Sequence, residues 1–258
     1  MKKILSIIII GVFATLLGMP ICNECVAKNN YLTTASVAST LKGNKYVVTR
    51  DVWVQDFKKI KIMVDADIRY SQSEDGPQVL LTLDENLHEM FDIHVEVNTL
   101  IVAPKEKYRG TKIQPTKFVV EISSEKLEMI TINSNARFDV QTEVSTPELK
   151  IENTTNGRIY SMKAINVEEL EIENTGNGNI TLVGKAGEAN ILQTAGGKIN
   201  MENCAVSDCT CENSGSGDIY IYAVDFLTCQ IFGKGNVYYM GSPKIKKDVV
   251  GTGRLIRR

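Results

Sequence analysis

The sequence contains few of the residues on which metal and nucleophilic sites depend. Its 258 residues include only two histidines, His88 and His94, and neither lies in a zinc-binding or nucleophile motif. The four cysteines that follow residue 27 form no C-x-x-C pair or other zinc-like spacing. The formal net charge is only −2, so electrostatic attraction to nucleic acid is not expected. We therefore expect no metal, no cofactor and no nucleic acid partner.

Long apolar runs are also absent after the N-terminal segment, so no later segment is expected to cross a membrane as a helix. The run Ile4–Leu17 follows two lysines and is too short to span a bilayer, which is typical of a signal peptide. We expect cleavage after Ala27, which makes residues 1–27 the signal peptide. A cut before Cys22 would leave a lipid anchor there, but the bulky Ile21 disfavours it. The mature protein is predicted to be exported to the periplasm or the outer cell surface.

A repeat dominates the second half of the chain, where seven copies of an eleven-residue motif start 18 to 21 residues apart. Leu170–Ile180 reads L-E-I-E-N-T-G-N-G-N-I, and Cys209–Ile219 reads C-T-C-E-N-S-G-S-G-D-I. Leu227–Val237 and Ile245–Leu255 are weaker copies, and Ile130–Val140 is a degenerate first copy. A repeat this short cannot bury a hydrophobic face alone, so the copies must stack on one another.

When the copies are aligned, residues of the same kind fall at the same position and stack into ladders. Positions are counted from zero at the first residue of each copy. Aliphatic residues or cysteine recur at positions two and ten, which we take as inward-facing. Position eight holds the turn glycines Gly157, Gly178, Gly197, Gly217, Gly235 and Gly253. Such a ladder indicates that every coil turns at the same place, with positive φ or with no room for a Cβ. Position four holds amides that can bond from coil to coil, namely Asn153, Asn174, Gln193 and Asn213.

We expect one strand before each turn and one after it. This pattern predicts an all-β fold, namely a single-stranded right-handed parallel β-helix with one coil per copy. This repeat β-helix is expected to cover residues 127–258. Residues 46–126 show short stretches of period-two alternation without a repeat, which indicates an irregular N-terminal β region continuous with the helix. Its one helix candidate is Asp84–Met90. The small and polar residues 28–45 are expected to form a linker.

Three groups of residues carry a family resemblance. They are the turns N-T-G-N-G-N-I and N-S-G-S-G-D-I, the late segment G-K-G-N-V-Y-Y-M-G-S-P-K-I, and front segments that begin at Phe57, Asp84 and Asn98. Together they resemble the head-domain family of GIN-type auto-transporter adhesins, roughly over residues 46–258. The resemblance implies a β-helical fold, export by a Bacteroidetes-like bacterium and a role in adhesion, and it supplies no catalytic residue. The chain departs from the pattern where Phe138 takes the glycine position of the first copy.

Aromatic residues are the strongest candidates for binding. Position eleven, outward beside the aliphatic ladder, holds Tyr160, Tyr220 and Tyr238, and Tyr222 lies two residues beyond Tyr220. We expect Tyr220 and Tyr238 to be neighbours on one sheet face. Exposed tyrosines can stack on sugar rings or anchor a protein partner. The alternative is ordinary stacking on a sheet surface.

Carboxylates form the second candidate, an outward stripe at position three with Glu152, Glu173 and Glu212. We interpret this stripe as a solvated face, because no lysine or arginine occupies a fixed place beside it. Repeated calcium binding is not expected, since Asp218 is the only acid among the six residues that follow the turn glycines.

Two further residue types favour a structural role. Cys211 and Cys229 hold the same position in adjacent copies, so a disulfide is geometrically conceivable in an oxidising compartment. Buried free thiols are the favoured interpretation. Trp53, the only tryptophan, is expected to pack against the first coil and not to bind a ligand.

These patterns favour an exported, non-enzymatic protein of the cell envelope that binds a glycan or a protein through a broad face. Two alternatives stay open. A polysaccharide-active enzyme on a β-helix would need a pair of carboxylates in a groove. A structural envelope protein would assemble its own rods, and concentration-dependent oligomers would favour it.

Overall fold

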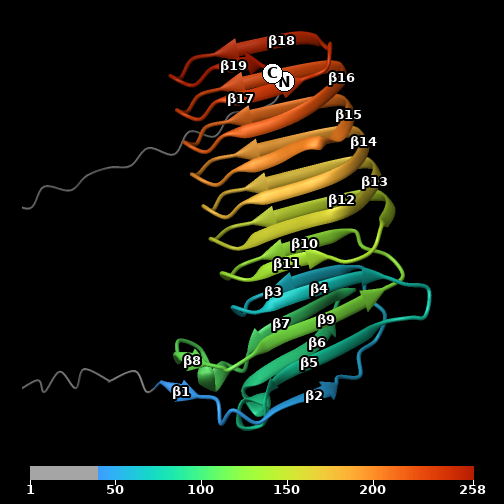
Figure 1. Cartoon of the computed structure of the whole chain (residues 1–258), viewed down its shortest axis with the longest axis vertical. Helices are drawn as coiled ribbons and strands as arrows, with labels where there is room; N and C mark the ends of the chain where they lie inside the picture. Colours follow the sequence, from blue (N-terminus) through green and yellow to red (C-terminus); the bar gives the residue numbers. More distant parts are fainter. Residues whose placement is uncertain (1–39) are drawn as a thin grey trace, which may run out of the picture. The chain divides into compact units, whose positions relative to one another are not determined.

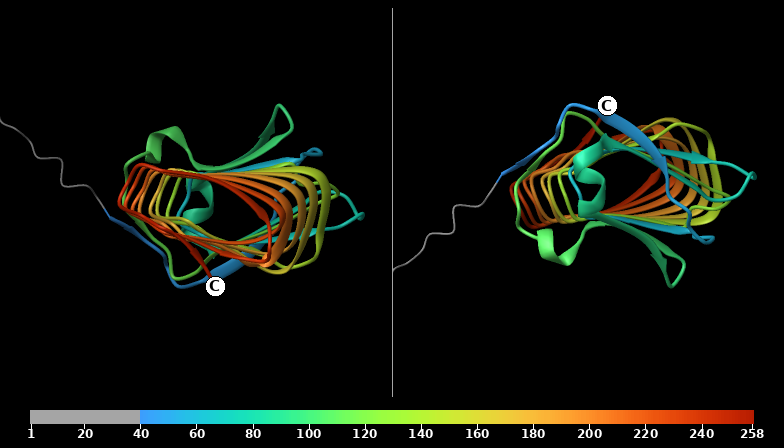
Figure 2. Two further views of the ribbon diagram at one scale, coloured as in Figure 1. Left: turned by 90° about the horizontal axis from the view of Figure 1, so that it is seen from above. Right: turned by 90° about the horizontal axis from the view of Figure 1, so that it is seen from below.

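The computed structural model describes residues 40–258, so the predicted signal peptide, its two cleavage sites and Cys22 lie outside the described residues. Within this range the chain is nearly all β and forms a solenoid of about six turns with an irregular β region at its N-terminal end (Figure 1). The predicted parallel β-helix is confirmed. Seen along the axis, the coils superpose in a flattened outline (Figure 2).

The repeat region consists of ten strands that stack in chain order. They are β10 (Met129–Ile132), β11 (Arg137–Val140), β12 (Val144–Asn153), β13 (Arg158–Asn174), β14 (Ile180–Gln193), β15 (Ile199–Asn213), β16 (Ile219–Ile231), β17 (Val237–Met240), β18 (Lys244–Val249) and β19 (Leu255–Arg257). Each pairs in parallel with the equivalent strand of the next coil, so that Ile172 lies between Ile151 and Ile191. One repeat therefore makes one coil.

The unequal spacing of the copies is absorbed at one corner of the coil. Between β13 and β14, Tyr160 pairs with Thr181 but Ala164 pairs with Val183, so two extra residues are taken up between these pairs. Similar shifts recur between β14 and β15 and between β15 and β16. Such bulges bend a strand without ending it, which lets β13 to β16 continue round the corner.

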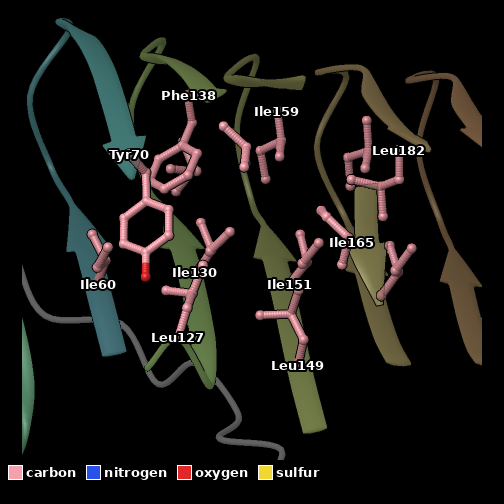
Figure 3. Packing of buried hydrophobic residues seen from close by; sticks show 14 of the residues in the cluster. Ile60, Tyr70, Leu127, Ile130, Phe138, Leu149, Ile151, Ile159, Ile165 and Leu182 are labelled. Carbon is pink, nitrogen blue, oxygen red and sulfur yellow. The ribbon is translucent and has the colours of Figure 1, made fainter. Parts of the chain in front are cut away.

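The first copy aligns differently from the prediction. Phe138 pairs with Ile159 and not with the glycine of the next copy, and Ile130 pairs with Ile151. The predicted alignment, which put Phe138 at the glycine position, is therefore wrong by two residues. A shift of two preserves the inward side of a strand, and Phe138 is fully buried, stacked 6.2 Å from Tyr70 between ring centroids (Figure 3).

The N-terminal region adds coils out of chain order. β3 (Lys59–Ile62) and β4 (Asp67–Gln72) pair in parallel with β10 and β11 and so make a preceding coil. β7 (Thr99–Pro104) and β9 (Phe118–Ser124), later in the chain, pair in parallel with the other edges of β3 and β4. The hydrophobic core therefore runs without a break from the N-terminal region into the repeats.

Strands that pair mostly antiparallel, together with short helices, close the N-terminal end. They are β1 (Leu41–Lys42), β2 (Val47–Asp51), β5 (Gln78–Asp84), β6 (Phe91–Glu96), β8 (Ile113–Gln114) and the 3-10 helices η1 (Glu85–Met90) and η2 (Glu106–Tyr108). The predicted helix candidate is thus the 3-10 helix η1, whose Leu87 is fully buried. β1 falls in the segment expected to be a linker, and it pairs with β8. Among residues 40–258, no helix is long and apolar enough to cross a membrane.

The C-terminal end is open, because β18 and β19 each have a neighbour on one side only. The inward column that holds Ile191, Cys211 and Cys229 continues into Lys247, which pairs with Cys229. A charge thus occupies the last inward position of the column, an arrangement that protects sheet edges from further pairing.

Candidate functional site

The turn glycines permit the coils to lie close together, and this close stacking fixes the spacing of the side chains on the outer faces. A Cβ built on Gly178 would lie 1.7 Å from the carbonyl oxygen of Gly157, and one on Gly217 would lie 1.8 Å from that of Gly197. The six turn glycines have no positive φ. Of the two predicted reasons for the ladder, the absence of room for a Cβ is therefore the correct one.

The buried amides act mainly within each coil and not between coils as predicted. Asn153 Nδ2 donates to Gly157 O at 2.8 Å, and the amides of the next three copies donate to their own turn glycines in the same way. One amide pair bonds between coils, where Asn174 Nδ2 donates to Gln193 Oε1 at 2.9 Å. Each bond crosses its turn, so the turns are braced individually and the residues after them are held in place.

Tyr220 lies just after the turn that Asn213 braces, and Tyr238 lies just after the next turn, where Ile231 takes the place of the amide. The two tyrosines pair in register on β16 and β17, and their rings stack with centroids 4.7 Å apart and planes 13° apart. The prediction that they are neighbours is confirmed. Since neighbouring strands fix their spacing, the two rings form a stacked aromatic pair whose geometry is set by the backbone.

Two cations lie beside this tyrosine pair. Lys198 Nζ is 4.0 Å from the centroid of the Tyr220 ring, and the Arg258 guanidinium is 5.6 Å from it. Arg258 also forms an ion pair with Glu202. Partial burial, with Asp218 nearby, raises the pKa of Tyr220. The phenol therefore stays neutral and can donate a hydrogen bond to a ligand.

The other two predicted tyrosines differ in their relation to the pair. Tyr222 lies on the same face of β16 two residues on, next to Met240 of β17, and is 38% exposed. Tyr160 occupies the same column, but Thr181 and Asn200 separate it from Tyr220. The structure thus brings three of the four tyrosines together and leaves Tyr160 apart.

The acidic stripe includes a lysine that the sequence analysis did not place. Lys150 Nζ lies 2.8 Å from Glu173 and 3.2 Å from both Glu152 and Glu171. The expectation that no base stands beside the stripe is therefore wrong. Hydrogen bonding to Glu173 raises the pKa of Lys150, and the same bond lowers the pKa of Glu173. Glu173 is therefore held ionised, whereas a general acid needs a raised pKa.

The four cysteines of the described range are free and buried inside the coils. Cys211 and Cys229 pair in register as predicted, and both remain thiols. Burial raises the pKa of Cys204 to about 11 and that of Cys209 to about 12. Protonated thiols inside a packed core are poor nucleophiles and metal ligands, and the part of the chain that the structure describes contains no cluster of metal-ligating side chains.

Trp53 is not where the sequence analysis expected it. Its side chain is 83% exposed and does not pack against a coil. It follows β2 and lines a hollow on the outer face of β4, β5 and β9. The periodicity of the sequence could not predict this exposure or the hollow, because Trp53 lies outside every strand and its neighbours in space come from distant segments.

The family follows from comparison with known domains. Residues 56–243 match the model of the family described as "Putative auto-transporter adhesin, head GIN domain". The chain belongs to this family. The match covers most of the chain, from just before β3 to just before β18. The resemblance noted in the turn motifs is therefore confirmed.

Solved structures of similar proteins share the GIN-domain architecture. A "putative adhesin" from Parabacteroides merdae is 29% identical with a TM-score of 0.67, and the similarity covers 86% of this chain and 100% of that one. A "putative adhesin" from Bacteroides fragilis is 24% identical with a TM-score of 0.78, over 84% and 100% of the chains. A "putative lipid binding protein" from Parabacteroides distasonis is 23% identical with a TM-score of 0.70, over 85% and 100%. No curated protein sequence matches the chain.

Proposed function

We propose that the protein is an exported, non-enzymatic adhesin of the cell envelope, which binds an extended ligand through the face that carries the tyrosine pair. Family membership supports the adhesin class. The observation that carries the proposal is the stacking of Tyr220 on Tyr238, with Lys198 against the same surface. Aromatic residues next to cations are the groups that contribute most to binding at interfaces.

The geometry favours a broad ligand over a small one. The two rings lie on the outside of a sheet, and their register and mutual stacking leave them little freedom, so little conformational entropy is lost when a ligand binds. A glycan chain can pack its C–H groups against the edges of the stacked tyrosine rings and offer hydroxyls or acidic groups to Lys198 and Arg258. A protein partner would use the same surface as an anchor point.

A lipid ligand, which the name of the Parabacteroides distasonis relative suggests, fits this chain less well. The inward columns are filled by side chains that are fully or almost fully buried, such as Ile172, Ile199 and Ile219. An acyl chain would therefore lie on the outer surface and expose its own apolar area to water. The adhesin proposal does not depend on a cavity.

The two alternatives lack a specific observation in their favour. A glycan-active enzyme would need a carboxylate with a raised pKa, whereas the bond to Lys150 lowers the pKa of Glu173. For a rod that grows end to end, Ile245 and Val249 leave partly exposed apolar surface on the last coil, but Lys247 between them places a charge in the inward column.

The test is binding of the full mature chain to an array of glycans, host-matrix proteins and lipid vesicles, in parallel with Tyr220→Ala/Tyr238→Ala. We expect a glycan or matrix protein to bind and the double variant to lose at least about tenfold in affinity, as for a hot-spot aromatic pair. Tyr160→Ala is the matched control, because it removes an exposed tyrosine from the same column three coils away from Tyr220. Equal losses in both variants, or binding to vesicles alone, would contradict the proposal.

A further inference from the structure

A polar hollow with a volume of about 1060 Å³ lies near the N-terminal end of the solenoid, well separated along the stack of coils from the tyrosine pair. Its floor is the outer face of β4, β9 and β5, and its rim includes the β4–β5 loop and the segment that follows β2. The loop, in cyan, extends past the outline of the coils (Figure 2). The side chains that line it include Asp51, Trp53, Arg69, Ser71, Asp75, Glu121 and Ser123.

Trp53 supplies the one large aromatic surface of the hollow. Its indole is 83% exposed although it is the only tryptophan of the chain. A tryptophan is usually well buried, and leaving one in water forgoes about 1.5–3 kcal/mol or more of transfer free energy. The ring therefore offers a flat apolar face that a ligand can cover with a gain in free energy.

The floor supplies paired donors and acceptors at strand spacing. Arg69 and Glu121 pair in register on β4 and β9, and Arg69 Nη1 donates to Glu121 Oε1 at 3.2 Å. Two residues further on, Ser71 pairs with Ser123. A guanidinium, a carboxylate and hydroxyls in adjacent rows can each bond to neighbouring hydroxyl groups of one ligand.

The charges that line the hollow limit which classes of ligand can bind there. Three carboxylates line the hollow, those of Asp51, Asp75 and Glu121, against the one guanidinium of Arg69. An anionic polymer or a nucleic acid would meet net negative charge. A lipid would find a floor of serine, carboxylate and amide groups that it cannot satisfy. A neutral saccharide has C–H faces that cover an indole and a rim of hydroxyls that match the floor.

We infer that this hollow is a binding site for a neutral oligosaccharide, with one sugar ring stacked on Trp53 and its hydroxyls bonded to Arg69 and Glu121. The site uses none of the residues of the tyrosine pair and does not rest on the function proposed for that pair. Two sites on one rigid rod would let a single protein hold two glycan segments, which multiplies affinity without new contacts.

The lone tryptophan makes the test direct, since all tryptophan emission comes from Trp53. The full mature chain is titrated with oligomers of glucose, mannose, xylose and N-acetylglucosamine, and with an acidic peptide and phosphatidylglycerol vesicles for comparison. We expect at least one neutral oligosaccharide to give a saturable change with a shift of the emission to shorter wavelength. The peptide and vesicles should give none.

Variants of the lining residues distinguish binding at this site from nonspecific binding. Arg69→Met and Glu121→Gln keep the reporter and are expected to weaken binding at least about tenfold, because each leaves a ligand hydroxyl unpaired. Trp53→Ala, followed by affinity electrophoresis in gels that contain the oligosaccharide, should lose retardation. Because Trp53 is exposed, this variant should fold normally, which circular dichroism checks.

The tyrosine double variant should titrate like the wild-type chain, so this result is distinguishable from failure of the adhesin proposal. The inference is overturned if no neutral oligosaccharide changes the emission, or if the peptide or vesicles change it instead. It is also overturned if the change persists undiminished in both Arg69→Met and Glu121→Gln.

Discussion

Replacing one turn glycine should destabilise the solenoid far more than replacing its immediate neighbour. The pair to compare is Gly197→Ala and Gly196→Ala. Both glycines lie in the turn between β14 and β15, and neither has positive φ, so backbone conformation does not distinguish them. What differs is the atom that an added Cβ would meet.

At Gly197 the new Cβ would lie 2.0 Å from the carbonyl oxygen of Gly178 and 2.6 Å from Asn174 Nδ2. Ordinary contact needs about 3.4 Å or more, so the backbone of the adjacent coil must move by more than 1 Å. That movement also breaks the buried bond in which Asn174 Nδ2 donates to Gly178 O at 3.0 Å. Overpacking costs about 1–3 kcal/mol and an unmade buried hydrogen bond about 1–3 kcal/mol, so we expect a loss of roughly 2–6 kcal/mol.

At Gly196 the nearest atoms belong to side chains, Asn177 Oδ1 at 2.9 Å and Ser216 Oγ at 3.4 Å. Ser216 Oγ can rotate away towards solvent. Asn177 Oδ1 accepts a hydrogen bond from Gly196 N at 3.0 Å, but this bond is exposed, so water can replace it if the side chain moves. Loss of glycine freedom in the unfolded chain offsets about 0.4–1 kcal/mol of any cost. The net change in the free energy of unfolding should therefore stay within about 1 kcal/mol of zero.

Urea denaturation followed by circular dichroism measures both variants. The midpoint and the m-value are compared together, because a stack of coils can unfold in parts and a change in m reveals loss of cooperativity. A loss of 2–6 kcal/mol is a large fraction of the about 5–15 kcal/mol that stabilises a typical domain. The reasoning is refuted if Gly197→Ala lies within about 0.5 kcal/mol of wild type, or if Gly196→Ala is equally destabilised.

Two further predictions concern the ends of the solenoid. At the C-terminal end, Lys247→Ile removes the charge from the inward column and should cause concentration-dependent association, measured by light scattering. Lys246→Ile, at the adjacent outward position, is the control and should not associate. Equal behaviour of the two variants would show that the inward charge has no special role. At the N-terminal end, burial by itself would raise the pKa of Asp84, but its carboxylate accepts the backbone N–H groups of Thr116 at 2.6 Å and Lys45 at 2.8 Å, and the pKa is lowered. Asp84 therefore stabilises the fold above its unfolded pKa of about 3.9, and this contribution is lost as pH falls through the lower folded pKa. Asp84→Asn should be less stable at pH 7 and should lose less stability than wild type below about pH 4; parallel pH curves would contradict this.

Much of the repeat region could be predicted because its signal is local and recurrent. Each copy is one coil, so residues at equal positions must lie in register, and this alone places Tyr220 beside Tyr238. The degenerate first copy was misaligned by two residues, since Phe138 replaces the aliphatic residue of the ladder and alanine replaces the glycine. A shift of two keeps the inward side, so the pattern contained nothing to correct it.

The candidate sites depended on contacts that no periodicity encodes. Lys150 reaches three carboxylates because a long flexible side chain can cross to the next coil. The hollow at Trp53 needs β9 to lie beside β4, although more than forty residues separate them in the chain. Only the pairing of strands out of chain order decides that.

The sequence by itself determined the coil, its turn and which side chains face inward, because stacking of identical units leaves one register that buries the apolar columns. Only the tertiary structure decided how the N-terminal strands insert below β3 and β4, that Trp53 stays in solvent, and that Lys247 ends the inward column at an open edge. The physical reason is that ladders arise from nearest-neighbour interactions repeated along the chain, whereas hollows and ends arise where that repetition stops.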